Sequence, residues 1–287
     1  MITWSDELIN DIARRRSVIF LGSGISCNSR GARGEIPKAW KEFLENASSN
    51  LRPNRHIRSL LIKQDYLTSC EIIKRNLGRD RFHQLLRDNF STPRFAHAPI
   101  HEAIFKLDSR IVATPNFDKI YETYASHEAK GSIIIKHHYD DDVAGVIRSD
   151  DRIILKVHGT IDSLDRMIFT RKEYAAARSK YENFYKLLEA LALTHTFLFL
   201  GCGVNDPDIK LLLEDNFFLH PSQRSHFFVS PKRELHPEII GIIEDTMNLK
   251  ILQYDKRNSH LELLESINNL IEQVDHKRED LRRTSNW

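Results

Sequence analysis

The chain has 287 residues, of which 41% are hydrophobic and 29% charged, a balance that excludes an intrinsically disordered protein. Its 42 basic and 40 acidic side chains leave a formal net charge of only +2, so no global field favours nucleic acid or an anionic membrane. The longest apolar runs fall far short of the ~20 residues that cross a bilayer.

Seven short runs rich in apolar residues predict seven β-strands. In chain order they lie at residues 17–22, 110–114, 132–136, 152–157, 196–201, 226–230 and 250–254. Most of them show no polar alternation, which is typical of strands that helices bury on both faces. Helical patterns separate the runs, so we expect an α/β fold with a mostly parallel sheet flanked by helices.

Two long spacers are predicted to be helical. Residues from about 37 to 105 carry helix patterns and no convincing strand, which indicates a helical lobe inserted after the first strand. The second spacer, residues 160–193, ends in a long helical pattern. Because no internal repeat or low-complexity linker interrupts the chain, we expect a single domain over residues 1–287.

The tail is predicted to form an amphipathic C-terminal helix over about residues 259–283. Its apolar residues recur at three-to-four spacing between charges: Leu263, Ile267, Leu270 and Val274, with Leu281 further on. This apolar face either packs on the chain's own sheet or forms an interface with a second copy or a partner.

The first strand runs into a glycine-rich turn, Gly22-Ser23-Gly24, with Ser26 placed to cap the segment after the turn. Glycines let a backbone approach a pyrophosphate closely, and free N–H groups at a helix start hold its charge. A strand followed by G-x-G is also common as a plain turn. A dehydrogenase would need an acidic residue after a second strand about 20 positions later, and no strand lies there.

Two later strands also end in polar side chains. The second strand leads into Thr114 and then presents Asn116 and Asp118 at the edge of the sheet where ligands of α/β proteins bind. The fourth strand ends at His158, and the following glycine lets the chain turn. Asn and Asp here also suit helix capping, and a lone His at a strand end is often structural.

A second glycine-rich strand end occurs at Gly201 and Gly203. Asn205, Asp206 and Asp208 come next and open a helix. Such a second turn suits a ligand with two halves, although the acidic residues are equally suited to cap a helix that has Pro at its first position.

Cysteine usage and the start of the chain indicate a cytoplasmic protein. Cys27, Cys70 and Cys202 are odd in number and widely spaced, which suits neither a disulfide framework nor a metal site. Cys27 lies just after the glycine turn and is interpreted as a small packed residue. The first residues, M-I-T-W-S-D-E-L, have neither the basic region nor the apolar stretch of a secretion signal.

The four motifs together resemble those of the sirtuin superfamily. G-S-G-I-S, T-P-N-F-D, K-V-H-G and F-L-G-C-G stand in the family's order, where sirtuins read roughly G-A-G-I-S, T-Q-N-I-D, H-G and G-T-S. The resemblance covers residues 18 to about 209, and the strand at 226–230 continues it. It implies a Rossmann-like sheet that carries the helical lobe.

The chain also departs from the sirtuin deacetylases. These carry a zinc module of two C-x-x-C pairs after the His-Gly motif, whereas residues 160–195 contain no cysteine. Structural zinc needs four closely spaced ligands, so we expect no zinc module and no metal site. The G-I-P-D-F-R stretch of deacetylases is reduced to residues 35–40, and Pro115 replaces Gln. These departures argue against recognition of an acetyl-lysine peptide.

The pattern looks instead like the bacterial sirtuin-like effectors of anti-phage defence. That resemblance implies cleavage of the nicotinamide–ribose bond of NAD+, the substrate, to nicotinamide and ADP-ribose, which depletes the cell of NAD+. It also implies a homo-oligomer and a separate sensor or activator chain, such as an ATPase translocase or an Argonaute-like protein. No direct nucleic-acid binding or membrane partner is expected.

The resemblance also implies roles for individual residues. Asn116 would orient the ribose and the attacking water, and His158 would act as general base, since an unperturbed imidazole has a pKa of about 6.5. Asp118 would orient Asn116 or the nicotinamide. The residues expected to bind the nucleotide are Gly22, Ser23, Gly24, Ser26, Thr114, Gly201, Gly203 and Asp206.

Two alternatives stay open. An NAD-dependent protein deacylase would release nicotinamide only in the presence of an acylated peptide. A non-catalytic module that senses NAD+ or an ADP-ribose nucleotide would bind without turnover, and it has no need for a base such as His158 beside Asn116.

Overall fold

The computed structural model describes residues 1–204, 206–207, 209–210, 212–213 and 224–284. All seven predicted strands are present, and in the described part of the chain they form one sheet in the order β3-β4-β2-β1-β5-β6-β7. The strands are β1 Ser17–Leu21, β2 Ile111–Thr114, β3 Ile134–His137, β4 Ile153–Lys156, β5 Thr196–Leu200, β6 His226–Pro231 and β7 Leu249–Tyr254. Every pairing in it is parallel, so the α/β prediction is confirmed.

The strand order changes direction at the centre of the sheet. From β1 the chain moves outward to β2 on one side, and β5 later pairs with β1 on the other side. The topology therefore reverses between β1 and β5. Ligands of open parallel sheets bind beyond the carboxyl ends of the strands at such a reversal.

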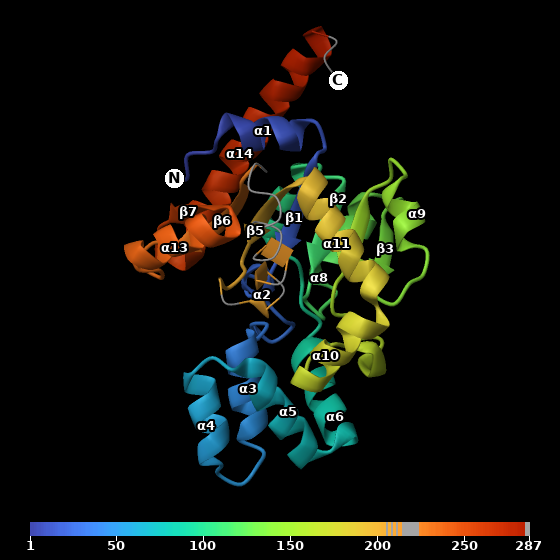
Figure 1. Cartoon of the computed structure of the whole chain (residues 1–287), viewed down its shortest axis with the longest axis vertical. Helices are drawn as coiled ribbons and strands as arrows, with labels where there is room; N and C mark the ends of the chain where they lie inside the picture. The colour runs from blue at the N-terminus through green and yellow to red at the C-terminus, as the bar shows by residue number, and fades with distance from the viewer. Residues whose placement is uncertain (205, 208, 211, 214–223, 285–287) are drawn as a thin grey trace.

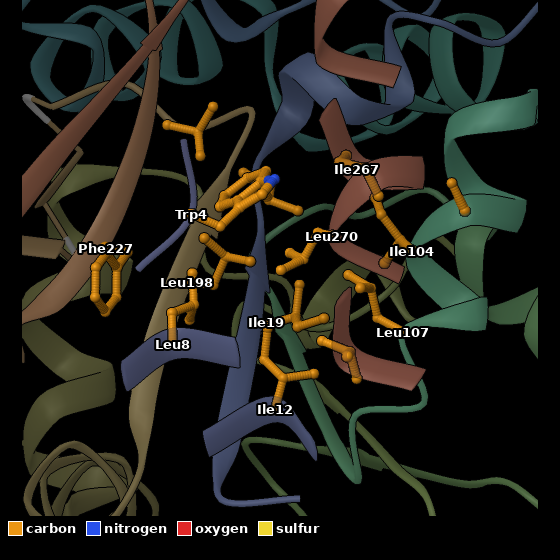
Figure 2. Packing of buried hydrophobic residues seen from close by; sticks show 14 of the residues in the cluster. Trp4, Leu8, Ile12, Ile19, Ile104, Leu107, Leu198, Phe227, Ile267 and Leu270 are labelled. Atoms are coloured by element: carbon orange, nitrogen blue, oxygen red, sulfur yellow. The ribbon is translucent and has the colours of Figure 1, made fainter. Parts of the chain in front are cut away.

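Helices cover both faces of the sheet because alternate strand residues point to opposite sides. Ile19 and Leu21 of β1 pack in a core with α1 Asp6–Ala13, α7 Pro99–Lys106, α8 Ile120–Glu128 and α14 Arg257–Thr284. Figure 2 shows part of this core, where Trp4 and Leu8 meet residues of the sheet and α14. Val18 and Phe20 face the opposite core, with α9 Val143–Ile147, α11 Glu182–Thr194 and α13 Pro237–Met247.

A helical segment lies between β1 and β2, beyond the carboxyl edge of the sheet (Figure 1). Its helices are α3 Trp40–Ser48, α4 Arg55–Ile62, α5 Tyr66–Leu77 and α6 Arg79–Phe90, and α7 then leads to β2. Asn54 and Asp65 accept backbone N–H bonds as the N-caps of α4 and α5. The segment has a core of its own, in which Phe43 and Phe82 pack with Phe169.

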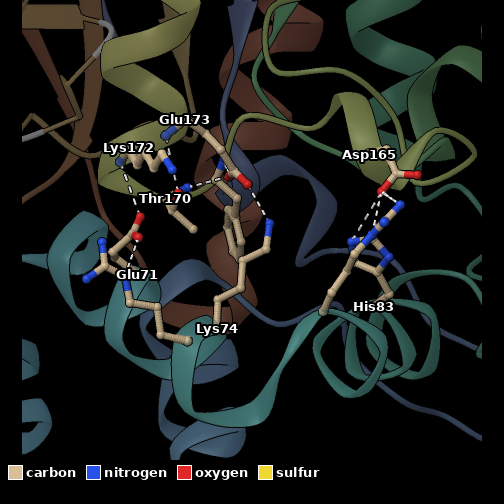
Figure 3. A network of polar contacts seen from close by, with 10 residues as sticks. Glu71, Lys74, His83, Asp165, Thr170, Lys172 and Glu173 are labelled. Carbon is tan, nitrogen blue, oxygen red and sulfur yellow. Dashed lines mark hydrogen bonds and ion pairs between the residues drawn. The ribbon is translucent and has the colours of Figure 1, made fainter.

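Polar contacts join this segment to the residues that come after β4 (Figure 3). Arg79 lies 2.6 Å from Asp165 in the 3-10 helix η1 Leu164–Arg166. Lys74 of α5 pairs with Glu173 of α10 Arg171–Lys180. Glu173 also accepts the N–H groups of Phe169 and Thr170 at 2.9 and 2.8 Å, so one carboxylate both caps α10 and ties it to α5.

The C-terminal helix α14 passes behind α1 in Figure 1 and packs against α1 and α7. Its predicted apolar residues are buried in the chain's own core, which decides the open choice in favour of packing on the chain itself: Leu263, Ile267, Leu270, Val274 and Leu281. No helix within the described ranges combines the length and the apolar character that crossing a membrane requires.

Candidate active site

The sheet register brings the four motifs to one edge. Thr114 pairs with Lys156, so Asn116 and His158 each lie two residues beyond a matched pair on β2 and β4. On the other side of β2, Leu21 of β1 pairs with Leu200 of β5, and Gly22 and Gly201 come next. Four adjacent strands therefore end in the residues that the sequence singled out.

The glycines hold the ends of β1 and β5 together. A Cβ atom on Gly22 would lie 2.4 Å from the Gly201 oxygen, and one on Gly24 would lie 2.9 Å from the same atom. Gly201 has φ +66°, a conformation that favours glycine. The N–H groups of Gly22 and Gly24 donate to the carbonyls of Leu200 and Gly201. These glycines thus serve close strand packing, and their N–H groups are already used within the protein.

A buried hydrogen-bond network links the first and second motifs. Ser26 donates its hydroxyl to Asp118 Oδ2 at 2.8 Å, and Asn116 Nδ2 donates to Ser26 Oγ at 3.2 Å. Thr114 Oγ1 donates to the Leu21 carbonyl at 2.7 Å and accepts the N–H of Asn116 at 3.1 Å. Asn116 is half-buried, whereas Ser26, Thr114 and Asp118 are buried. The amide of Asn116 is therefore oriented by the protein before any ligand arrives.

The same network corrects the predicted capping role of Ser26. The one-turn helix α2 Ser23–Ser26 begins after Gly22, which is its N-cap and has no side chain to offer. Ser26 ends this helix and directs its hydroxyl to Asp118. Asp118 in turn accepts the N–H of Ile120 at 3.0 Å, a capping contact at the start of α8. Asp118 thus satisfies one N–H group at the start of α8, although the N-cap of this helix is Lys119, and it also accepts from Ser26.

His158 lies in an aromatic pocket and is 4% exposed. Its Nδ1 is 3.2 Å from the hydroxyl of Tyr174, whose ring meets the imidazole edge to face at 4.7 Å. Phe117, the residue directly after Asn116, has its ring 6.5 Å from the imidazole. Tyr174 lies on α10, 16 residues beyond His158, and nothing in the local sequence signals this contact.

A cavity of about 680 Å³ opens beside the glycine contact, over the ends of β1, β5, β6 and β7. Gly24 and Gly201 line it, together with Pro231, Tyr254 and His260. The hydroxyl of Tyr254 is 2.7 Å from His260 Nδ1, at the kinked start of α14. The volume falls in the range of small-molecule sites, roughly 300–1,000 Å³.

Of the predicted site residues that the structure describes, only Gly24 and Gly201 line this cavity. A separate enclosed space of about 10 Å³ is lined by Ser26, Thr114, Asn116 and Asp118. Gly203 is exposed and Asp206 is half-buried. Asp206 donates its N–H to the Gly203 carbonyl at 2.9 Å. Asn205 and Asp208 lie outside the described residues.

Three charged or titratable residues near the network were not predicted: His101, Glu122 and Lys156. Lys156 is 1% exposed, and its Nζ lies 2.8 Å from Glu122 Oε2 and donates to the Asp118 carbonyl at 2.6 Å. Lys156 is the first residue of the K-V-H-G motif, but a lysine at the end of a strand is normally expected to face solvent, so the motif did not signal a buried role. The partner that keeps it buried, Glu122, is distant in sequence.

Burial controls the titration of two side chains beside the network. Burial, with smaller contributions from Glu42 and Asp118, raises the pKa of Cys27 to about 11, so the thiol is protonated at neutral pH. This agrees with its interpretation as a packed residue. Burial lowers the pKa of His101 to about 4, so this imidazole is neutral and accepts the N–H of Ala98 at its Nδ1.

The described residues contain no group of three or more His, Cys, Asp or Glu side chains arranged to hold a metal ion.

Comparison with known proteins matches residues 110–252 to the model of the SIR2-like domain. The protein named NAD(+) hydrolase ThsA from Enterococcus faecium is 27% identical over 77% of this chain and 44% of its own length. The protein of the same name from Acinetobacter baumannii is 25% identical over 79% of this chain and 45% of its own length. Defense-associated sirtuin 2 from Bacillus subtilis is 24% identical over 72% of this chain and 20% of its own length. The chain therefore spans less than half the length of these relatives. The matches confirm the predicted resemblance to sirtuin-like proteins of defence.

Proposed function

We propose that this chain, whose residues 110–252 match the model of the SIR2-like domain, is an NAD+ hydrolase that cleaves the nicotinamide–ribose bond and acts in anti-phage defence by depleting NAD+. The observation that carries the proposal is the juxtaposition at one sheet edge of an oriented Asn116 amide and a buried His158. The names of the relatives, NAD(+) hydrolase and defense-associated sirtuin, support the same reaction and setting.

Cleavage of the nicotinamide–ribose bond needs little general-acid catalysis. The positively charged nicotinamide is a good leaving group, and the bond breaks through an oxocarbenium-like transition state, as in glycoside hydrolysis. The protein must position the ribose, exclude bulk water and supply one water molecule to the anomeric carbon. The Asn116 amide, held by Ser26 and through it by Asp118, is suited to orient the ribose and that water.

His158 takes the role of general base. In the tautomer that this role requires, Nδ1–H donates to the Tyr174 hydroxyl, and Nε2 then accepts the proton from water or from a ribose hydroxyl. Tyr174 is thus a positioning residue that selects the tautomer and fixes the plane of the ring. The aromatic surroundings of His158, which include Phe117, keep bulk water away from the reacting carbon.

We assign the dinucleotide to the edge of β1 and β5 and the 680 Å³ cavity beside it. The pyrophosphate and nearby ribose would contact residues 22–26 and Thr114, beside the glycines that hold the ends of β1 and β5 together. The adenosine half would lie toward Gly201, with Gly203 and Asp206 at its border. Because the N–H groups of Gly22 and Gly24 are already donated, Ser23 is the residue of this turn best placed to donate to a phosphate.

We further propose that residues 1–287 act as one catalytic domain, with the helical insertion at about 37–105 and the C-terminal helix at about 259–283 as parts of it. Cys27, Cys70 and Cys202 form no disulfide with one another, which suits the cytoplasm. Homo-oligomerisation and activation by a separate sensor chain complete the proposal, and they follow from the resemblance to defence effectors. Since the apolar face of α14 is buried in its own core, contacts between copies would use other surfaces.

One experiment separates this function from its alternatives. The protein is incubated with NAD+, with and without an acetyl-lysine peptide, and nicotinamide and ADP-ribose are quantified while NAD+ binding is measured by calorimetry. Release of both products without peptide supports the hydrolase. Release that requires the peptide and yields an acetylated ADP-ribose identifies a deacylase. Binding without release, even after candidate activator proteins are added, identifies a sensor.

A further inference from the structure

Lys156 is a charged side chain for which the proposed reaction has so far given no role. It ends β4, two residues before His158, and is 1% exposed. Removing an ammonium group from water costs several kcal/mol unless a counter-charge and hydrogen bonds replace the lost hydration. The structure supplies both, since Glu122 Oε2 lies 2.8 Å from Nζ and the Asp118 carbonyl accepts from it at 2.6 Å.

The hydrogen bond from Lys156 to the Asp118 carbonyl links the lysine to the network that holds Asn116. Asp118 is held at three atoms: its carbonyl by Lys156, its Oδ1 by the N–H of Ile120, and its Oδ2 by the hydroxyl of Ser26. Ser26 Oγ in turn receives the side-chain amide of Asn116. Hydrogen bonds therefore fix the turn from Asn116 to Ile120 at both of its ends. Lys156 adds a hydrogen bond to the backbone carbonyl of Asp118 in the middle of this turn.

Lys156 does not lie where a substrate can reach it. The enclosed space that it shares with Ser26 and Asn116 holds a volume of only about 10 Å³, which is room for no more than one water molecule. His101 lines the same space and is fully buried. An effect of Lys156 on NAD+ must therefore pass through other residues, and Asp118 is its point of contact with them.

We propose that Lys156, with Glu122 as its counter-charge, is a positioning residue that fixes the Asn116–Asp118 turn and so orients the Asn116 amide for the reaction. This inference rests on the proposed NAD+ hydrolysis. It deepens that proposal by assigning the lysine of the K-V-H-G motif to the support of Asn116 on the neighbouring strand.

The competing explanation is that Lys156 serves only to balance the buried charge of Glu122. Three variants separate the two explanations. Glu122→Gln removes the counter-charge and so destabilises the fold, but it keeps the bond from Lys156 to the Asp118 carbonyl. Lys156→Met removes that bond and leaves Glu122 uncompensated, so it also destabilises the fold. The double variant Lys156→Met/Glu122→Gln lacks the bond but contains no uncompensated charge.

Turnover is the first readout. If Lys156 positions the turn, the double variant is at least as thermally stable as either single variant but loses about tenfold to a hundredfold in kcat, with KM within about threefold of wild type. Glu122→Gln retains kcat within about threefold. If the double variant recovers wild-type kcat, charge balance alone explains Lys156 and the inference is wrong.

The second readout does not depend on turnover. The side-chain amide resonance of Asn116, assigned by its loss in Asn116→Ala, reports directly on the orientation of this amide. It is expected to shift in the double variant and to remain in place in Glu122→Gln. An unchanged resonance in the double variant overturns the inference even if wild type is inactive. Wild type without nicotinamide release but with the expected shift refutes the proposed hydrolysis and leaves the positioning role intact.

Discussion

The contact between Gly22 and Gly201 gives the most sharply defined prediction for the site. In Gly22→Ala the new Cβ would lie 2.4 Å from the Gly201 oxygen and 2.8 Å from both Cα and Sγ of Cys202, whereas ordinary contacts begin at 3.4 Å. Two of these three atoms belong to the backbone, so the ends of β1 and β5 must separate by about 1 Å, which strains the Gly22–Leu200 hydrogen bond. We expect the free energy of unfolding to fall by about 1–3 kcal/mol, the usual cost of overpacking.

Gly203→Ala is the matched control. A Cβ on Gly203 meets no described atom within 4 Å, and its φ is not in the left-handed region, so this substitution is expected to change stability by about 0.5 kcal/mol or less. Urea denaturation of both variants measures the difference, and NAD+ affinity by calorimetry measures its effect on the site. Equal stabilities for the two variants would refute the account of the glycines as a packing contact.

Three further predictions concern groups around the site. Tyr174→Phe removes the partner of His158 Nδ1, and kcat is expected to fall about tenfold to a hundredfold with little change in KM; an unchanged kcat and pH–rate profile would argue against a role for Tyr174 in fixing the tautomer. Glu173→Gln weakens the N-terminal cap of α10 and its ion pair with Lys74, so the free energy of unfolding should fall by about 1 kcal/mol, measured by urea denaturation. Burial lowers the pKa of His226 to about 4, so below pH 6.5 the unfolded state binds a proton that the folded state refuses, and stability falls with pH until about pH 4. His226→Asn keeps an acceptor for the N–H of Phe197 and should remove about 1.4 kcal/mol per pH unit of this dependence between pH 6 and 4.5, which denaturation at several pH values checks.

The strands were predictable because their signal is local. Runs such as Val18–Leu21 and Phe197–Leu200 are apolar without alternation, which only a strand buried on both faces requires. Their order in the sheet was not predictable, since it depends on which helices cross over which face. The individual bounds of α4 and α10 were not predictable within the two helical spacers, because both helices are short and at least half of their residues are polar.

Of the site, only the residues that directly follow strands could be predicted from the sequence. Asn116 and His158 come directly after strands, so a parallel sheet places them on the same edge. Tyr174 and Glu122 lie on helices, and only tertiary packing brings them to His158 and Lys156. The burial of Lys156 was not predictable, because a lysine is normally exposed and a single sequence does not reveal that a counter-charge will be buried with it.

The central claim is that Asn116 and His158 cleave NAD+ without a protein substrate. The measurement that tests it most directly is the release of nicotinamide and ADP-ribose from NAD+ by the purified protein and by Asn116→Ala and His158→Ala, with no peptide present and with NAD+ binding measured in parallel. The account predicts that the wild type releases both products in equal amounts and that each variant binds NAD+ but releases at least about a hundredfold less. Undiminished release by either variant would contradict it, and so would binding without release by the wild type even after candidate activator proteins are added.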